Sequence, residues 1–462
     1  MLKASITTSS PLFRGFAMMK DDSSLSIYRD YTKCIYCDAC VSACEDQGME
    51  IYEESDAGES LPPQVAGNIA IADSLCIGCG QCTIACPVGC LTEKDDTQKV
   101  KDAIADKTKI VVGMTAPTVR VGVSETMGLE PGAETAPKLI TALKKLGFDY
   151  VFDVTSAADL TIMEEGSELL ERVKTGGKFP MFTSCCPGWI NLVETCYPEL
   201  IPNLSSCRSP QAMSAALIKS YFAQKLGKNP ADIIVVSLMP CTAKKMEIAR
   251  PQLKTEEGVP ETDVVITVRE IGRMLKEAGY DADSYTALAD TPYDEFLGVS
   301  SGAGLIFGST GGVMEAALRT AVTLTGGDGT DFVAVRGDGE DGVKTYDVTL
   351  GDGTELHVAA IHGSGRAREW LESTNNGEGF HFVEVMACPH GCVGGGGMVP
   401  ADDDVILQRA AGLYSFDAGQ TIRKSHENPI IQQLYKDFLG EPLGHLSHKL
   451  LHTHYSDRSP KE

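Results

Sequence analysis

The chain has 462 residues, 16 of them cysteine, and a formal net charge of -24. This length exceeds one ordinary hydrophobic core and favours several domains, each large enough to fold without disulfides. The negative charge opposes binding to nucleic acid or to an anionic membrane surface, and no apolar run approaches the roughly 20 residues of a membrane span. Cysteines clustered at short spacings in so long a chain favour metal ligation in a reducing compartment.

Residues 1–20 differ in composition from the acidic chain that follows. They contain no acidic side chain, are rich in Ser and Thr, and carry the cations Lys3, Arg14 and Lys20. This composition is typical of an organellar presequence. An ordinary disordered tail has the same composition, so both interpretations stay open.

The next predicted domain, residues 32–98, contains one cysteine pattern twice. The copies are Cys34-x2-Cys37-x2-Cys40-x3-Cys44 and Cys76-x2-Cys79-x2-Cys82-x3-Cys86. In the bacterial ferredoxin pattern, three cysteines wrap one 4Fe-4S cubane and the fourth ligates the other cubane. We therefore assign Cys34, Cys37, Cys40 and Cys86 to one cluster, and Cys76, Cys79, Cys82 and Cys44 to a second. A pair of zinc sites is the alternative, which the doubled spacing disfavours.

Residues 100–421 alternate between short apolar runs and longer amphipathic stretches. Buried strands are predicted at 109–114, 150–154, 179–182, 233–238, 264–268, 332–335, 356–361 and 382–385. Helices are predicted at 136–146, 160–173, 210–226, 268–278, 313–325 and 366–373. The alternation favours an α/β catalytic domain with parallel sheets covered by helices. Residues 422–462 are predicted to form a helical tail packed on this domain.

Four further cysteines are far apart in sequence but follow predicted strands. Cys186, Cys241 and Cys388 each come shortly after a strand, and Cys392 follows four residues after Cys388. Because ligands collect at the carboxyl ends of strands in α/β sheets, these loops are predicted to converge on one buried site. The spacing by itself predicts a third metal centre.

Three motifs around these cysteines resemble the signatures of a known enzyme family. The motifs are TSCCPGW at 183–189, MPCTAKKME at 239–247 and EVMACPHGCVGGG at 384–396. Their sequences and order are similar to those of iron-only (FeFe) hydrogenases, and the resemblance extends from residue 32 to the end. It implies an enzyme that interconverts protons and H2, in a compact form with a two-lobed catalytic domain and a bacterial-ferredoxin-like α+β domain carrying two accessory 4Fe-4S clusters.

The resemblance also implies a cofactor and its ligands. The family's H-cluster is a 4Fe-4S cubane bridged by a cysteine to a di-iron subsite with CO, cyanide and azadithiolate, which maturation proteins build and insert. By residue match, the cubane ligands are Cys186, Cys241, Cys388 and Cys392, with Cys392 as the bridge. The residues that match contacts of the di-iron subsite are Lys244, Ala116, Pro117, Thr118, Gln211, Met239 and Met386. The glycines at 394–397 are expected to let the backbone approach the cofactor.

A buried site for H2 chemistry needs a relay of titratable groups that connects it to water. The resemblance identifies Cys185 as the thiol that passes a proton to the azadithiolate amine. Glu165, Glu168 and Arg172 stand at i, i+3 and i+7 of a predicted helix, and Ser205 matches the hydroxyl member. The implied order is amine, Cys185, water, Glu165, Ser205, Glu168 and Arg172. A solvated Glu/Arg helix face is the alternative.

Two other classes of protein share parts of this pattern. Hydrogenase-like iron-sulfur assembly factors keep two cubanes without di-iron chemistry, and H2 sensors depart from the TSCC motif. The intact motifs and relay residues of this chain favour the enzyme.

The resemblance implies ferredoxin as electron donor, and we expect a monomer. Met1 and Leu2, the acid-free Ser/Thr-rich stretch and the Arg14-Gly15-Phe16 segment together resemble the short cleavable presequences of hydrogenosomal proteins, which favours the hydrogenosome over the cytosol.

Overall fold

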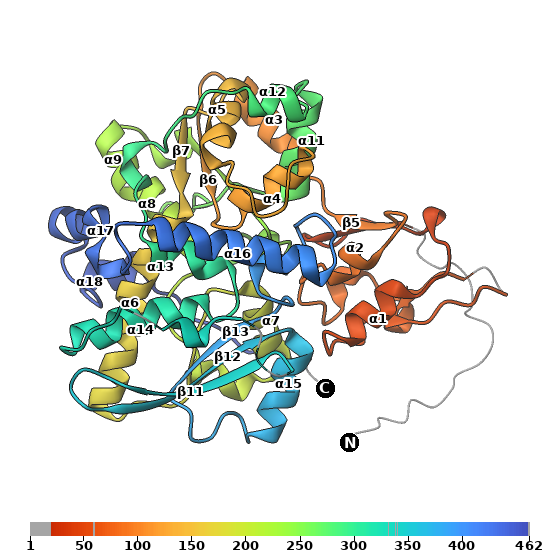
Figure 1. The fold of residues 1–462 in the computed structure, drawn as a ribbon. Coiled ribbons are helices and arrows are strands. Elements are labelled where there is room, and N and C mark those ends of the chain that lie inside the picture. Colours follow the sequence, from red (N-terminus) through yellow and green to blue (C-terminus); the bar gives the residue numbers. More distant parts are fainter. Residues whose placement is uncertain (1–19, 59–60, 331, 338, 340, 461–462) are drawn as a thin grey trace.

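The computed structural model describes residues 20–460, except 59–60, 331, 338 and 340. The predicted leader therefore lies outside the described residues, apart from Lys20. A small N-terminal unit projects from one side of a larger two-lobed body (Figure 1).

The N-terminal unit is a ferredoxin-like α+β domain. Its antiparallel sheet has the order β1-β2-β5, formed by β1 (Lys20–Asp21), β2 (Ile27–Asp30) and β5 (Leu91–Glu93). A hairpin pairs β3 (Tyr52–Glu53) with β4 (Gln64–Val65). Helices α1 (Ala39–Glu45) and α2 (Gln81–Ala85) pack together, and each begins after a residue in the left-handed region, Asp38 and Gly80. The two cysteine runs thus form two similar loop-helix units. Helix α3 (Thr97–Ala105) leads into the body.

The first lobe of the body contains an all-parallel sheet with the order β10-β9-β6-β7. Its strands are β6 (Ile110–Thr115), β7 (Tyr150–Asp153), β9 (Ile233–Met239) and β10 (Val264–Thr267). Runs of Val and Ile suit such strands because helices cover both faces of a parallel sheet. Helices of this lobe include α4 (Val119–Thr126), α5 (Ala136–Leu146), α11 (Val268–Glu277) and α12 (Ala282–Thr286).

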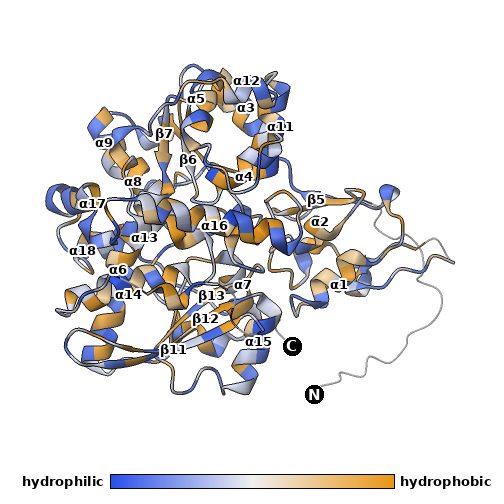
Figure 2. Cartoon of the chain, in the orientation of Figure 1, coloured by the Kyte–Doolittle hydropathy of each residue, from blue (hydrophilic) through white to orange (hydrophobic). Residues whose placement is uncertain are grey.

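The second lobe contains a sheet with the order β11-β12-β13-β8. Strands β8 (Met181–Phe182), β12 (Glu355–His362) and β13 (Phe382–Met386) are parallel, whereas the edge strand β11 (Val343–Thr349) is antiparallel to β12. Helices α7 (Pro187–Cys196) and α15 (Ser364–Ser373) share one apolar cluster with the sheet. Helices α6 (Val154–Thr175) and α14 (Gly312–Leu324) share the cluster on its other face. The α/β prediction is confirmed, with one antiparallel edge added. In Figure 2 hydrophobic colour concentrates on the central strands, and hydrophilic colour gathers on peripheral helices.

Three local predictions differ from the structure. The predicted strand at 332–335 is a 3-10 turn, Val333–Val335, and the nearby strand is β11, whose exposed polar positions concealed it. The predicted helix at 210–226 is α8 (Pro210–Leu217) and α9 (Ala223–Leu226) joined by a π-helical turn. Helix α6 begins six residues before its predicted start because Asp153 caps it by accepting a hydrogen bond from the Thr155 backbone N–H.

The C-terminal tail packs across the body. Helix α16 (Asp403–Gly419) crosses between the lobes in Figure 1, and α17 (Pro429–Leu434) and α18 (His445–Leu451) follow it. Leu434 and Leu451 share an apolar cluster with Leu160 of α6 and Leu217 of α8. In the described part of the chain, no helix is long and apolar enough to span a membrane.

Candidate active site

One cavity between the two lobes collects the cysteines that follow the strands. Cys186 lies at the start of α7 just after β8, Cys241 follows β9, and Cys388 and Cys392 follow β13. All of them line the same cavity. The sequence-predicted convergence of these thiols is therefore present in the structure.

Burial makes the charged form of these thiols unfavourable in the absence of a cation. Burial and the neighbouring Cys186 raise the pKa of Cys241 to about 12. Burial and neighbouring thiols also raise the pKa of Cys388 and Cys392 well above the usual value. A cationic metal cluster removes this penalty, because thiolates are soft donors that suit iron-sulfur clusters. The donor set thus fits a cubane.

A polar network closes one side of the cavity. Lys244, at the start of α10 (Lys244–Glu247), donates to the Cys185 carbonyl at 3.2 Å and to Glu247 at 2.9 Å. Burial alone would lower the pKa of Lys244, but the Glu247 carboxylate outweighs it and raises the pKa above its usual value. Gln211 donates to Glu247 at 2.8 Å and accepts from Ser237 at 2.6 Å. The cavity therefore has a fixed cation in its wall.

The remaining predicted cofactor contacts also line the cavity. They are Ala116, Pro117 and Thr118 beyond β6, and Met239 and Met386 at the ends of β9 and β13. The hydroxyl of Thr118 is buried without a hydrogen-bonding partner in the described protein. An unpaired buried hydroxyl is costly, which fits a site whose ligand carries polar groups.

The glycine-rich segment after Cys392 packs closely against neighbouring protein backbone. Among its four glycines, Gly395 lines the cavity, whereas Gly396 packs against the N-terminal domain. A Cβ on Gly396 would lie 2.1 Å from the carbonyl oxygen of Cys79. This run therefore allows close approach of protein backbone, and Gly395 is the member that lines the cavity, so close approach of the run to the cofactor stays a prediction.

The predicted relay residues extend away from Cys185, which lines the cavity. Glu165 on α6 is fully buried, and neither of its carboxylate oxygens completes a hydrogen bond with a described residue. Burial, reinforced by the charge of Glu168, raises the pKa of Glu165 to about 8. Glu168 accepts from Ser205 at 3.0 Å and from Arg172 at 2.6 Å. The five predicted residues thus lie in one region, with the expected i, i+3, i+7 helix face.

The accessory cysteines form two groups in the N-terminal domain. Cys44, Cys76, Cys79 and Cys82 line one small cavity, although Cys44 belongs to the other sequence run. The pKa of Cys40 is raised to about 12 by burial and by its neighbours Cys86, Cys34 and Cys37. The last cysteine of each sequence run thus lies with the first three cysteines of the other run, as the spacing predicts. Cys90 lies beside the group that contains Cys40 and Cys86, with its sulfur 3.4 Å from that of Cys86.

Direct hydrogen bonds join the second cysteine loop to the catalytic site. Thr242, next to Cys241, donates to the Gly78 carbonyl at 2.7 Å. Gln81 donates to the Gly394 carbonyl at 3.0 Å. Cys79 is also close enough to raise the pKa of Cys388. The cavity lined by Cys76, Cys79 and Cys82 therefore adjoins the active-site cavity.

Family comparisons cover both domains. Residues 109–396 match the model described as "Iron only hydrogenase large subunit, C-terminal domain". Residues 33–103 match "4Fe-4S dicluster domain", and residues 403–458 match "Iron hydrogenase small subunit". The chain belongs to the iron-only hydrogenase family. It is an oxidoreductase whose substrates are protons and H2.

Individual relatives agree with this family. The chain is 46% identical to the NADP-reducing hydrogenase subunit HndD of Solidesulfovibrio fructosivorans, over 95% of this chain and 76% of the relative. It is 39% identical to iron hydrogenase 1 of Clostridium pasteurianum, over 94% and 76%. The structure of FeFe hydrogenase HydA1 from Chlamydomonas reinhardtii superimposes with a TM-score of 0.68 at 43% identity, covering 78% of this chain and 99% of that one.

A more distant group has a different description. The cytosolic iron-sulfur assembly component 3 of Bos taurus is 29% identical to this hydrogenase over 89% of the chain and 88% of the relative. The fold is thus shared by enzymes and assembly components, and the site residues must distinguish the two.

Sequence reasoning missed several polar residues around the relay. Ser206 donates to Glu168 through its hydroxyl at 3.1 Å and its backbone N–H at 3.0 Å. His452 of the C-terminal tail contacts both Ser206 and Glu164. No local pattern links these positions, because the contacts form only when the tail packs on α6.

Proposed function

We propose that this hydrogenase reduces protons to H2 reversibly, with electrons from ferredoxin, at an H-cluster held between its two lobes. Cys186, Cys241, Cys388 and Cys392 would hold its cubane, and Cys392 would also hold the di-iron subsite. One observation carries the proposal: a single buried cavity holds four thiols and adjoins Cys185 at the head of a series of titratable groups. When bound, the di-iron subsite supplies the metal at which protons and electrons combine.

The other cavity residues orient and shield this group. The Lys244 ammonium is a buried donor suited to an anionic diatomic ligand such as cyanide. The hydroxyl of Thr118, with Ala116 and Pro117, suits the second polar ligand. Met239 and Met386 form soft apolar walls that exclude water, and Gln211 holds the network that fixes Lys244.

Proton transfer follows the series Cys185, water, Glu165, Ser205, Glu168 and Arg172. A carboxyl group with a pKa of about 8 keeps its proton at neutral pH, so Glu165 is suited to donate toward Cys185. The hydroxyl of Ser205 donates to Glu168 at 3.0 Å, and Arg172 toward the helix end holds the Glu168 carboxylate.

Electrons enter through the N-terminal domain in this proposal. Two 4Fe-4S clusters, held by the two groups of cysteines described above, connect a docked ferredoxin to the active site. The hydrogen bond between the loops at Gly78 and Thr242 supports this route from the N-terminal domain to the active site. The protein acts as a monomer and receives its di-iron subsite from maturation proteins.

An iron-sulfur assembly role is the second candidate, favoured by the more distant relatives. This role predicts a protein that holds cubanes but does not turn over H2. A role as an H2 sensor likewise predicts that H2 binds without turnover. Neither role needs an acid such as Glu165 buried beside the cavity, so the relay residues favour the enzyme.

The deciding experiment is expression with the H-cluster maturation proteins in an anaerobic host. We expect H2 evolution from reduced ferredoxin and from reduced viologen. Protein that contains its cubanes and the di-iron subsite but makes no H2 with either donor contradicts the enzyme proposal.

We also propose that the native location is the hydrogenosome, with the cytoplasm as alternative. The support is the acid-free leader containing Lys3 and Arg14. N-terminal sequencing of protein from its native cell tests this: a start near residues 15–19 supports import, and an intact Met1 favours the cytoplasm.

A further inference from the structure

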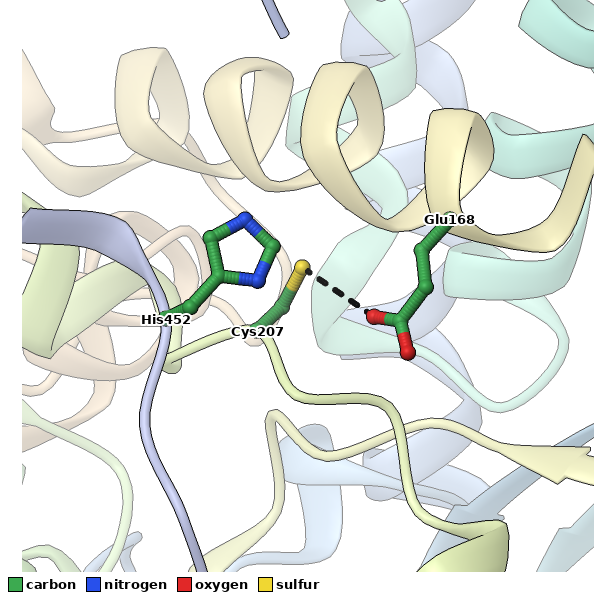
Figure 3. A group of neighbouring side chains, drawn as sticks. All are labelled: Glu168, Cys207 and His452. Atoms are coloured by element: carbon green, nitrogen blue, oxygen red, sulfur yellow. Dashed lines mark hydrogen bonds between the residues drawn. The ribbon is translucent and has the colours of Figure 1, made fainter. Parts of the chain in front are cut away.

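A polar cluster lies on the side of Glu168 that faces the C-terminal tail. Figure 3 shows Glu168 of α6, Cys207 of the loop before α8 and His452 of the tail converging on one another. Their ligand-type atoms lie within 4.8 Å of one another, and His452 is 7% exposed. The proposed relay uses Glu168 but neither of the other two.

A metal ion is a poor explanation for this cluster. Both ring nitrogens of His452 already have partners, Ser206 at 2.8 Å and Glu164 at 3.0 Å. Glu168 already accepts from Arg172, Ser205 and Ser206. Cys207 is only at the limit of contact, with its sulfur 4.0 Å from a Glu168 oxygen. Ligation would require breaking most of these bonds, so the cluster is better described as a hydrogen-bonded chain.

The chain runs from Glu164 through His452 and Ser206 to Glu168. Glu164 also accepts from the Tyr435 hydroxyl at 2.5 Å and from the Leu443 backbone N–H at 2.8 Å. Burial opposes ionisation of Glu164, but the hydrogen bonds from His452, Tyr435 and Leu443 outweigh it and lower the pKa of Glu164 below its usual value. Glu164 is therefore an acceptor at neutral pH, and Nε2 of His452 must carry a hydrogen.

Donor counting then leaves two arrangements for Ser206, whose hydroxyl has one hydrogen. When His452 is neutral, its Nδ1 is an acceptor, so the Ser206 hydroxyl donates to Nδ1 and not to Glu168. When His452 is protonated, its Nδ1–H donates to Ser206, and the hydroxyl is free to donate to Glu168 at 3.1 Å. The charge of His452 thus decides how many donors Glu168 has.

We propose that His452 is a positioning residue that controls the proton affinity of Glu168 through the hydroxyl of Ser206. Protonated His452 gives Glu168 an additional donor, which stabilises the carboxylate and favours proton release. Neutral His452 withdraws that donor, which favours the protonated acid. The C-terminal tail thereby makes the relay sensitive to the protonation state of His452.

Other groups around His452 are compatible with this role. Glu164 and Glu168 face it from α6, and Cys207 and Arg208 from the loop before α8, where Arg208 donates to the His452 carbonyl at 2.9 Å. The exposed His448 of α18 has its ring centroid 4.3 Å from that of His452. The two carboxylates favour the charged imidazole, while Arg208 and a charged His448 oppose it.

The coupling is tested without turnover, by following the His452 ring signal by NMR during pH titration of the oxidised protein. Glu168→Gln and Ser206→Ala each cut the chain, and both are expected to lower the imidazole midpoint, by about 0.7 unit for a hydrogen bond worth about 1 kcal/mol. His445→Gln, an exposed change at the start of α18, is the control and leaves the midpoint unchanged. The same midpoint in wild type and in both chain-cutting variants overturns the proposal.

A second measurement connects the coupling to function and rests on the proposed relay. The ratio of wild-type to His452→Gln H2-oxidation rates is expected to rise about fivefold from pH 8 to pH 5.5, because outward proton release gains from protonated His452 only in the wild type. A ratio independent of pH overturns the proposal. Failure of the relay itself appears separately, as undiminished turnover in Cys185→Ala.

Discussion

The N-terminal domain and the catalytic domain both gather buried cysteines, but over very different lengths of chain. In the N-terminal domain, Cys76, Cys79 and Cys82 come from a single loop and helix, and the exchanged Cys44 is 32 residues from Cys76. In the catalytic domain, the cavity draws Cys186, Cys241 and Cys388 from three strand ends in two lobes. Local loops suit clusters that only pass electrons. A site that also needs protons and a shielded cavity requires a scaffold that brings remote groups together.

The largest expected effect separates proton supply from cluster binding in the catalytic domain. Cys185→Ala should retain the H-cluster yet lower turnover by about 1,000-fold, because it removes the thiol that adjoins the cavity without removing a ligand. Cys185→Asp should recover part of the activity, since a carboxylate can also carry a proton. The assay is H2 evolution from reduced viologen, with infrared spectra to verify the cofactor.

Cys196→Ala is the matched control for this change. Cys196 is a half-buried thiol at the end of α7, next to Thr195. It should keep wild-type turnover. Equal activity of Cys185→Ala and Cys196→Ala contradicts the relay assignment.

The second prediction tests the exchange of cysteines in the N-terminal domain. Cys44→Ala should remove the cluster of the downstream loop, and Cys86→Ala the cluster of the upstream loop, although sequence proximity alone suggests the reverse. Ferredoxin-driven turnover should fall in both, while viologen that reaches the active site directly still supports H2 formation. Iron analysis and EPR of the reduced protein identify the cluster that is lost.

Cys90→Ala provides the control, because its sulfur lies only 3.4 Å from Cys86 but has no proposed iron. It should retain both clusters. Loss of the upstream-loop cluster in Cys44→Ala would contradict the exchange.

The contrast between local patterns and contacts of distant segments also explains which parts of the fold could be predicted from the sequence. Strand β9 was predicted nearly to its bounds because a run of Val and Ile suits a strand that is buried on both faces. The run at 332–335 was equally apolar, but so short a segment fits a strand or a helical turn, and it forms a 3-10 turn. Edge strand β11 was not predicted because it has no apolar pattern. Its pairing with β12 stabilises it instead.

Prediction of the site followed a similar rule. The cluster cysteines were found because motifs mark them locally, and the relay residues were found because they match positions of the family. The contact between Glu164 and His452 joins positions 288 residues apart, and neither residue lies in a recognisable motif. The close contact of Gly396 with Cys79 was not predicted, because only the fold brings these two distant positions together.

The third prediction concerns this contact between the two domains. Gly396→Ala should destabilise the protein by roughly 1–3 kcal/mol, because the new Cβ meets the Cys79 carbonyl at 2.1 Å and forces the cluster loop away. Electron transfer from ferredoxin should slow more than viologen-driven turnover. Gly419→Ala, at an open position with nothing within 4 Å, is the control and should change neither. An equally stable Gly396→Ala protein shows that the domains do not pack this closely.

The smallest expected effect is the pH dependence of Glu165, a buried acid with a raised pKa that has no counterpart among the described residues of the N-terminal domain. Burial raises the pKa of this acid to about 8, so the acid form persists through neutral pH and is lost as pH rises above 8. The capacity of Glu165 to donate a proton is therefore present below pH 8 and should fall about tenfold between pH 7 and pH 9. Infrared spectra should show a carboxylic acid band that disappears over this range and is absent in Glu165→Gln. Glu171→Gln, an exposed change on the same helix, should keep the band. A band that is missing at pH 7 in the wild type means that Glu165 is ionised there, and the relay would then need another proton donor next to Cys185.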